Sequence, residues 1–275
     1  MSIHIPYGKG HLACDIQPNG LLVSRIDQLK SERSGLEIVE QAMENPIGSK
    51  PLQELAVGKK TCTIIISDHT RPVPSRDILP AMLTQLRQGN PDIDITLLVA
   101  TGCHRETTAA ELASKLGEEI ANNEKIVVHD AFDANSNVEI GILPSGAPLV
   151  IDRLAAETEL LVAEGFIEPH FFAGFSGGRK SVLPGVAGRE TVLANHCSEF
   201  IAHPCSRTGI LEGNPIHADM LWAAKAAKLQ FIVNVVLNGE KKVIHAVAGH
   251  PEAAHAKGVA FLDSLCGADA VEADI

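Results

Sequence analysis

The chain has 275 residues, enough for one large domain or two modest ones. With 45% hydrophobic and 4% aromatic residues, the composition argues against disorder and predicts a core of Val, Ile, Leu and Ala, as in layered α/β folds. The net charge of −11 argues against a broad basic surface for nucleic acid, but a locally positive pocket could still bind a small anion.

The cysteines and the N-terminus give no sign of secretion. The six cysteines are scattered without a Cys-x-x-Cys pair, so neither a zinc knuckle nor a disulfide framework is predicted. The N-terminal sequence does not resemble a signal peptide, and no apolar run approaches the length needed to cross a bilayer. We therefore expect a cytoplasmic protein with reduced thiols and with neither membrane nor nucleic acid among its partners.

The N-terminal part of the chain combines short strands and helices. Short apolar segments predict a hairpin of strands at 2–6 and 11–15, followed by another strand at 21–26. Apolar residues at helical spacing predict helices at 35–44 and 52–55. None of these segments carries a candidate site residue.

The next part of the chain alternates strands with helices. Strands are predicted at 61–67, 94–100 and 125–129. A helix that begins at a capping Ser75 and a helix capped by Thr107 or Thr108 separate them, a pattern typical of a parallel sheet. Right-handed crossovers would bring the loops 68–71 and 101–105 to the same rim of the sheet, where ligands bind in open parallel sheets.

The remaining elements complete a layered α/β fold. Further strands are predicted at 138–142, 148–151, 159–165, 230–237 and 242–247, and further helices at 189–195, 216–225 and 250–265. The Asn238-Gly239 dipeptide predicts that the last two strands form a hairpin. We expect a mostly parallel central sheet flanked by helices and accompanied by antiparallel hairpins.

A glycine-rich turn follows one of the buried strands. Gly174, Gly177 and Gly178 precede Lys180, and such a turn can present unpaired backbone N–H groups to an anion such as phosphate. The spacing nearly matches a nucleotide phosphate loop, but Arg179 stands where the second required glycine should be. A surface loop with a solvated Arg-Lys pair explains the same residues.

Three histidines follow strands or flank this turn. His104 ends a Thr-Gly turn, His170 precedes two phenylalanines, and His196 lies near a helix C-terminus. Imidazoles can exchange acid and base roles near neutral pH, and a neutral imidazole binds nickel, zinc or iron. Each histidine also has a structural alternative, such as a turn contact, a half-buried hydrogen bond or a favourable charge at a helix end. The residues alone therefore predict a pocket for an anionic ligand with acid/base histidines.

The other histidines singled out are expected to be structural. His69 should make a hydrogen bond in a turn beside two prolines. Solvated or capping roles are expected for His203, His217, His245, His250 and His255.

At the candidate site residues the sequence closely resembles the nickel-dependent lactate racemase family. The matching segments are Ser67-Asp-His-Thr-Arg-Pro72, Ala100-Thr-Gly-Cys-His-Arg105, Gly165-x-x-x-Pro-His170, Gly174-Phe-Ser-Gly-Gly-Arg-Lys180 and Asn195-His196. Five segments in the same order are far more specific than a single glycine motif.

The resemblance implies a covalently held nickel cofactor. In that family the cofactor is a nickel-pincer nucleotide, pyridinium-3,5-bisthiocarboxylic acid mononucleotide with nickel, joined to a lysine as a thioamide. Lys180 would be the attachment lysine and His196 the nickel ligand. Asp68, Gly177 and Gly178 would help to hold the cofactor.

The resemblance also implies a substrate and a reaction. His104 and His170 would be the acid/base pair on the two faces of a small 2-hydroxy acid, and Arg71 would bind its carboxylate. Removal of the hydroxyl proton with hydride transfer to the cofactor gives a planar 2-keto acid, and hydride return to the opposite face inverts C2. Lactate is the default substrate, whereas malate, aromatic hydroxy acids and sugar acids remain open.

The resemblance sets further expectations for the chain as a whole. Residues 1–275 would form the N-terminal, cofactor-attaching lobe, without the C-terminal lobe that closes the cleft, and the isolated fragment would be inactive. Partners would include the cofactor maturation enzymes, and a homodimer is open. Two rival functions also stay open: a P-loop-like nucleotide-binding enzyme that uses Lys180, and a nickel-binding module without catalysis.

Overall fold

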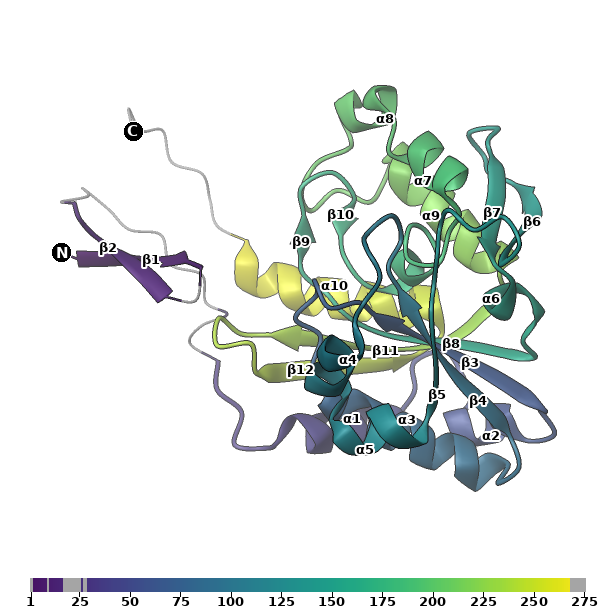
Figure 1. Ribbon diagram of the computed structural model, residues 1–275. Coiled ribbons are helices and arrows are strands. Elements are labelled where there is room, and N and C mark those ends of the chain that lie inside the picture. Colours follow the sequence, from purple (N-terminus) through teal and green to yellow (C-terminus); the bar gives the residue numbers. More distant parts are fainter. Residues whose placement is uncertain (1, 9, 17–25, 27–28, 268–275) are drawn as a thin grey trace.

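The computed structural model describes residues 2–8, 10–16, 26 and 29–267, and its centre is a six-stranded sheet in the order β12-β11-β8-β3-β4-β5 (Figure 1). The sheet consists of β3 (Thr61–Ser67), β4 (Asp94–Ala100), β5 (Lys125–Val128), β8 (Leu160–Phe166), β11 (Leu229–Leu237) and β12 (Val243–Gly249). Every neighbouring pair is parallel except β11 and β12 at one edge. The predicted α/β fold with a mostly parallel sheet is confirmed.

One face of the sheet is covered by the helices that precede and connect the first strands. These are α1 (Gly35–Glu44), α2 (Leu52–Ala56), α3 (Ser75–Gly89), α4 (Ala109–Leu116) and α5 (Glu118–Asn123). Strand side chains such as Ile64 and Leu97 pack there against Leu79 and Met82 of α3. Because β-branched and leucine side chains fill this layer, the low aromatic content is no obstacle to a dry core.

The opposite face is covered by later segments of the chain, which form a second apolar layer. They are β6 (Asn137–Ile142), β7 (Pro148–Asp152), α6 (Arg153–Glu157), β9 (Pro169–His170), β10 (Gly174–Phe175), the 3-10 helix η2 (Gly178–Ser181), α7 (Arg189–Asn195), α8 (Ser198–Ala202), α9 (Pro215–Ala226) and α10 (Pro251–Cys266). The chain therefore forms three layers, with the sheet between two helical layers (Figure 1). No helix among the described residues is long and apolar enough to span a membrane.

The predicted N-terminal hairpin is confirmed as β1 (Ser2–Tyr7) and β2 (Gly10–Asp15), which pair in antiparallel register. It lies to one side of the three layers in Figure 1 and exposes several apolar side chains. The predicted strand at 21–26 lies outside the described residues apart from Ile26.

Of the two helix caps predicted from the sequence, one is confirmed and one is wrong. Thr108 caps α4 through a capping box with Glu111, as the sequence predicts. Ser75, however, is the first residue of α3 rather than its cap, because Pro74 occupies the cap position. The Ser75 hydroxyl donates instead to the Glu164 carboxyl group (2.7 Å), a contact with the neighbouring strand that the local sequence does not reveal.

The hairpin of β11 and β12 has a longer turn than the Asn-Gly dipeptide suggests. The strands close at the pair Leu237 and Val243, and the side chain of Asn238 accepts hydrogen bonds from the backbone N–H groups of Glu240 and Lys242. The Asn238 side chain thus organises the turn, while the predicted hairpin itself is confirmed.

The topology directs the candidate loops to one rim. The chain runs from β3 to β4 and β5 on one side, whereas β8 and β11 lie on the other side of β3. Strand order thus reverses beside β3, and ligands bind at such switch points beyond the carboxyl ends of parallel strands. Ser67 pairs with Ala100 at the ends of β3 and β4, so the loops that follow start side by side.

Candidate functional site

A cavity of about 370 Å³ opens at this rim of the sheet. Its wall includes the ends of β3, β4 and β8 and the glycine-rich turn before η2. Every residue predicted from the sequence to belong to the site lines this one cavity: Asp68, Arg71, His104, His170, Gly177, Gly178, Lys180 and His196. Segments up to 128 residues apart in sequence, from position 68 to position 196, therefore meet in one place.

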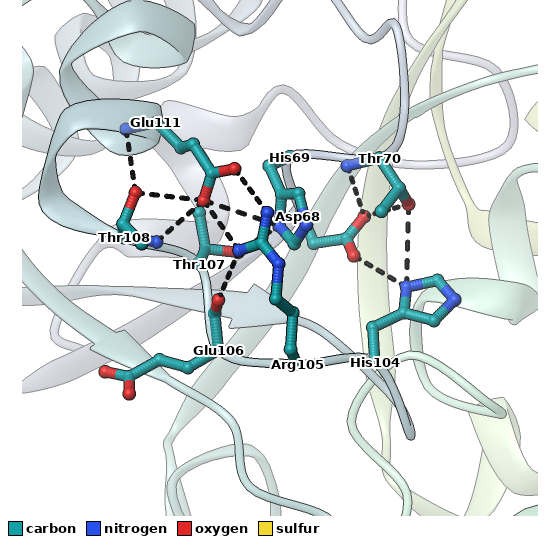
Figure 2. Close-up of polar contacts among 9 residues, drawn as sticks. All are labelled: Asp68, His69, Thr70, His104, Arg105, Glu106, Thr107, Thr108 and Glu111. Carbon is teal, nitrogen blue, oxygen red and sulfur yellow. Dashed lines mark hydrogen bonds and ion pairs between the residues drawn. The ribbon is translucent and has the colours of Figure 1, made fainter.

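Figure 2 shows how the loops after β3 and β4 are joined by Asp68 and His104. The Asp68 side chain is 1% exposed, and its Oδ2 lies 2.7 Å from Nδ1 of His104. Its Oδ1 accepts from the backbone N–H and the hydroxyl of Thr70. Both carboxylate oxygens thus have protein partners, and Asp68 fixes the orientation of a half-exposed His104 ring.

Arg105 and His69, in the same two loops, contact residues at or just before the start of α4 (Figure 2). Arg105 forms a bidentate ion pair with Glu111, which also caps the helix through Thr108. His69 makes a 3.0 Å hydrogen bond with the Thr107 hydroxyl, in the loop after β4, and not within its own turn as predicted. Neither Arg105 nor His69 belongs to the cavity wall.

Aromatic side chains connect the other histidines of the cavity. The ring of His170 stacks on Phe171 at 4.9 Å and meets the edge of Phe172 at 4.6 Å. Phe172 also contacts the ring of His196 at 5.1 Å, and the Lys180 ammonium lies 5.8 Å from the centre of the Phe172 ring. Phe172 therefore lies between all three of these polar residues.

The cavity favours neutral forms of its nitrogen groups. Burial lowers the pKa of Lys180 to about 7, and the charges of Arg179 and Arg71 add to the effect. Burial also lowers the pKa of His170 to about 3 and that of His196 to about 4, with Lys180 contributing to both. At neutral pH both imidazoles are uncharged, and much of Lys180 is a free amine that can act as a nucleophile.

This pKa predicts a distinctive chemical reactivity for Lys180. An amine reacts with an acylating reagent only when it is deprotonated, so labelling of Lys180 should rise steeply through pH 7 and level off above it. Ordinary lysines, with pKa values of about 10.4, should still gain reactivity up to about pH 10. Trace acetylation followed by peptide mass spectrometry measures each site, and a Lys180 profile like that of the exposed lysines would contradict the prediction.

Arg179 is deeply buried, contrary to its interpretation as part of a solvated pair. The side chain is 2% exposed, and its guanidinium donates to the carbonyls of Ala173 (2.8 Å), Phe175 (2.8 Å) and Gly177 (3.3 Å). It also contacts His217 (3.0 Å) and His255 (3.1 Å). Arg179 therefore holds the glycine-rich turn from within the protein, at the position where a nucleotide phosphate loop would need a glycine.

His255 is likewise buried, at 5% exposure, and His217 is half-buried, so the solvated or capping roles expected for them are wrong. Both belong to the cluster around Arg179, and His255 Nε2 lies 2.8 Å from the carbonyl of Ser176. No spacing signal joins these residues, because they come from η2, α9 and α10.

Replacing Arg179 with leucine should destabilise the protein strongly. The change removes the guanidinium donor from three carbonyls and the contacts with His217 and His255. The carbonyls of Ala173 and Gly177 still accept from the backbone N–H groups of Phe175 and Lys180, whereas each group left unpaired costs about 1–3 kcal/mol. Part of this loss is offset because the buried guanidinium no longer has to be desolvated. We expect a net loss of about 3 kcal/mol in the free energy of unfolding, measured by urea denaturation, with Arg179→Lys intermediate. Stability equal to wild type would rule out this structural role.

The two site glycines are required by packing within the protein. Gly177 (φ +78) and Gly178 (φ +55) both have backbone conformations that favour glycine, and a Cβ atom would meet Asn234 at Gly177 or His255 at Gly178. The N–H of Gly178 donates to the Asn234 side chain (2.7 Å). At Gly178, therefore, the N–H group expected to be free for an anion already has a protein partner.

The donors of the cavity fit a cofactor that is held by Lys180 and ligated by His196. Nδ1 of His196 is buried and has no hydrogen-bond partner among the described residues, and a neutral imidazole nitrogen of this kind is a good ligand for nickel. Within the described part of the chain, no group of three or more His, Cys, Asp or Glu side chains is arranged to hold a metal ion. Nickel bound jointly by His104, His170 and His196 would require such a group.

Sequence comparisons agree with these features. Residues 7–209 match the family model described as "Lactate racemase N-terminal domain". Over its whole length the chain is 53% identical to a lactate racemase of Thermoanaerobacterium thermosaccharolyticum and 51% identical to one of Lactiplantibacillus plantarum. It covers 65% and 66% of those proteins, just under two-thirds of their length.

Solved structures agree as well. The lactate racemase apoprotein of T. thermosaccharolyticum superposes with a TM-score of 0.91 over 96% of this chain and 63% of that one, at 53% identity. A protein of Thermotoga maritima, with a TM-score of 0.66 over 84% of this chain and 58% of that one, is 23% identical and shares the fold. From the family model and these identities, the chain belongs to the lactate racemase family.

Proposed function

We propose that this chain is the cofactor-attaching part of a 2-hydroxy acid racemase, with lactate as its default substrate. The observation that carries the proposal is the meeting of Lys180, His104 and His170 on one cavity. An amine that is partly neutral supplies a point of covalent attachment, and two imidazoles supply proton acceptors and donors. Identity to lactate racemases along the whole chain supports the same activity.

The hydrogen bonds of the two catalytic histidines give them complementary proton states. Because Nδ1 of His104 donates to Asp68, Nε2 of that ring keeps a lone pair and can take a proton. His170 accepts at Nδ1 from the backbone N–H of Ala173 (3.3 Å), so its neutral ring carries its proton on Nε2. Racemisation needs one group to take the hydroxyl proton and a second to give a proton to the oxygen of the other enantiomer.

Arg71 is the residue proposed to bind the substrate carboxylate. Its exposed guanidinium lines the cavity, and its planar fork matches the two oxygens of a carboxylate. The loop that carries Arg71 is held by Lys115, whose ammonium donates to the carbonyls of Arg71 (3.2 Å) and Val73 (3.3 Å). A fixed loop lets Arg71 orient the substrate between the two histidines.

Lys180 and His196 are the residues proposed to hold a nickel-pincer nucleotide, Lys180 through its amine and His196 as the nickel ligand. When bound, this cofactor supplies a hydride acceptor for C2 of the substrate. Gly177 and Gly178, which line the cavity, are proposed to contact the cofactor. The hydrogen bonds of Asp68 support a role in orienting His104 in preference to a direct role in holding the cofactor.

Intact-mass analysis tests this function. The full-length protein is coexpressed with the cofactor maturation enzymes, and we expect a nucleotide-sized adduct that maps to Lys180. Free nickel with an unmodified Lys180 would favour the metal-binding module. Affinity for ATP or GTP that depends on Mg²⁺, again without an adduct, would favour a phosphate-loop enzyme, although the buried side chain of Arg179 and the short η2 helix do not resemble that motif.

A further inference from the structure

A carboxyl group interrupts one fully buried strand of the sheet. Every residue of β8 is buried, and along one face of the strand Leu160 and Val162 are followed at the next alternate position by Glu164. The Glu164 side chain is 3% exposed. Burying a carboxyl group costs free energy unless contacts compensate, and local violations of this kind are expected at functional positions.

The protein provides partners for one of the two Glu164 oxygens. Oε1 accepts from the hydroxyl of Ser75 at 2.7 Å, with the N–H and hydroxyl of Ser67 at 3.4 Å. Oε2 is buried and has no hydrogen-bond partner among the residues that the structure describes. Glu164 also lines the cavity of the candidate site, next to Gly165 and Phe166.

The surroundings of Glu164 shift its protonation toward the neutral acid. Burial raises the pKa of Glu164, and Lys115, Ser75 and Ser67 offset only part of this rise. The Lys115 ammonium donates its hydrogen bonds to the carbonyls of Arg71 and Val73. Its positive charge therefore lowers the pKa of Glu164 through space. In a carboxylic acid whose Oε1 already accepts a hydrogen bond, the proton belongs on Oε2.

We propose that Glu164 contacts the ligand of this cavity, with the Oε2–H group donating a hydrogen bond to an acceptor oxygen of that ligand. The inference rests on the function proposed above. The acceptor belongs either to the mononucleotide cofactor or to the 2-hydroxy acid, since both carry anionic oxygens. A neutral donor binds such an oxygen, whereas a carboxylate at the same place would repel it.

The test compares a variant that keeps the donor with variants that remove it. Glu164→Gln keeps an N–H donor and an acceptor in the same volume. Glu164→Leu removes both but leaves the buried Ser75 hydroxyl without its partner, so the double variant Glu164→Leu/Ser75→Ala removes both groups together. Ser75→Ala alone is the matched control, because it removes the Oε1 contact and keeps Oε2.

Each variant is made as full-length protein with the maturation enzymes, and three quantities are measured: Tm, the fraction of Lys180 that carries the adduct, and KM for lactate. Glu164→Gln and Ser75→Ala should stay within about threefold of wild type in adduct and KM. The double variant should be worse by about tenfold or more in one of them, as expected for one lost charge-assisted hydrogen bond. A loss of adduct identifies the cofactor as the acceptor, and a raised KM with normal adduct identifies the substrate.

Other outcomes overturn the inference. A folded double variant that matches wild type in both quantities shows that Oε2 contacts no ligand. A Gln variant as impaired as the double variant shows that the carboxylate, and not a neutral donor, is needed. A double variant with a Tm well below that of Ser75→Ala shows that the Glu164 side chain stabilises the fold and does not contact the ligand. If wild-type Lys180 itself carries no adduct, the proposed function fails first, and the inference falls with it.

Discussion

Full-length protein in which Lys180 is replaced by alanine is expected to carry no covalent cofactor and to lose racemase activity completely. Among the described residues no other lysine lines the cavity, so no second amine can take over the attachment. The pKa of about 7 also sets Lys180 apart as the amine that is substantially neutral at physiological pH. Intact mass measures the adduct, and chiral chromatography of the hydroxy acid measures racemisation.

Lys225→Ala is the matched control for this prediction. Lys225 forms an ion pair with Glu252 (2.9 Å) at a partly exposed position outside the cavity wall, so its loss should leave both adduct and activity at the wild-type level. Racemisation by Lys180→Ala at a rate near that of wild type would refute the assignment of the attachment residue.

Alanine at His104 or at His170 is expected to lower kcat/KM for racemisation by about 10²–10⁴-fold in both directions. Each enantiomer needs both proton-transfer groups during one turnover, so either change interrupts the same cycle. The double variant should be little worse than either single variant, because residues that act as a unit are not additive. Adduct formation on Lys180 should persist in all three, which separates proton transfer from cofactor attachment.

Two further variants, Asp68→Asn and His69→Ala, are compared with His104→Ala. Asp68→Asn should reduce kcat by a smaller factor than His104→Ala, because the amide can still contact His104 but no longer selects the ring tautomer through a carboxylate. His69→Ala should have no effect on kcat, since His69 bonds to Thr107 outside the cavity wall. If His104→Ala and His69→Ala behaved alike, His104 would not be an acid/base residue.

Local sequence signals determined much of the fold. The apolar β-branched runs of β3 and β4 identify buried strands, and the capping residue Thr108 defines the start of α4. Alternation of strands and helices then predicts a parallel sheet, whose geometry places the loops 68–71 and 101–105 on one rim. These predictions succeed because hydrophobic period, capping and crossover handedness depend on residues close in sequence.

The sequence alone also determined which residues to place in the site, since five short segments carry the family pattern. Their partners were decided by the tertiary structure. Arg179 is buried because carbonyls of the glycine-rich turn and imidazoles from α9 and α10 surround it. Asp68 orients His104 because β3 and β4 end side by side. Glu164 is bonded at Oε1 by Ser67 of β3 and Ser75 of α3, and no described residue bonds to its Oε2. Burial and hydrogen bonding depend on distant segments meeting in space, and no local pattern of residue types encodes that meeting.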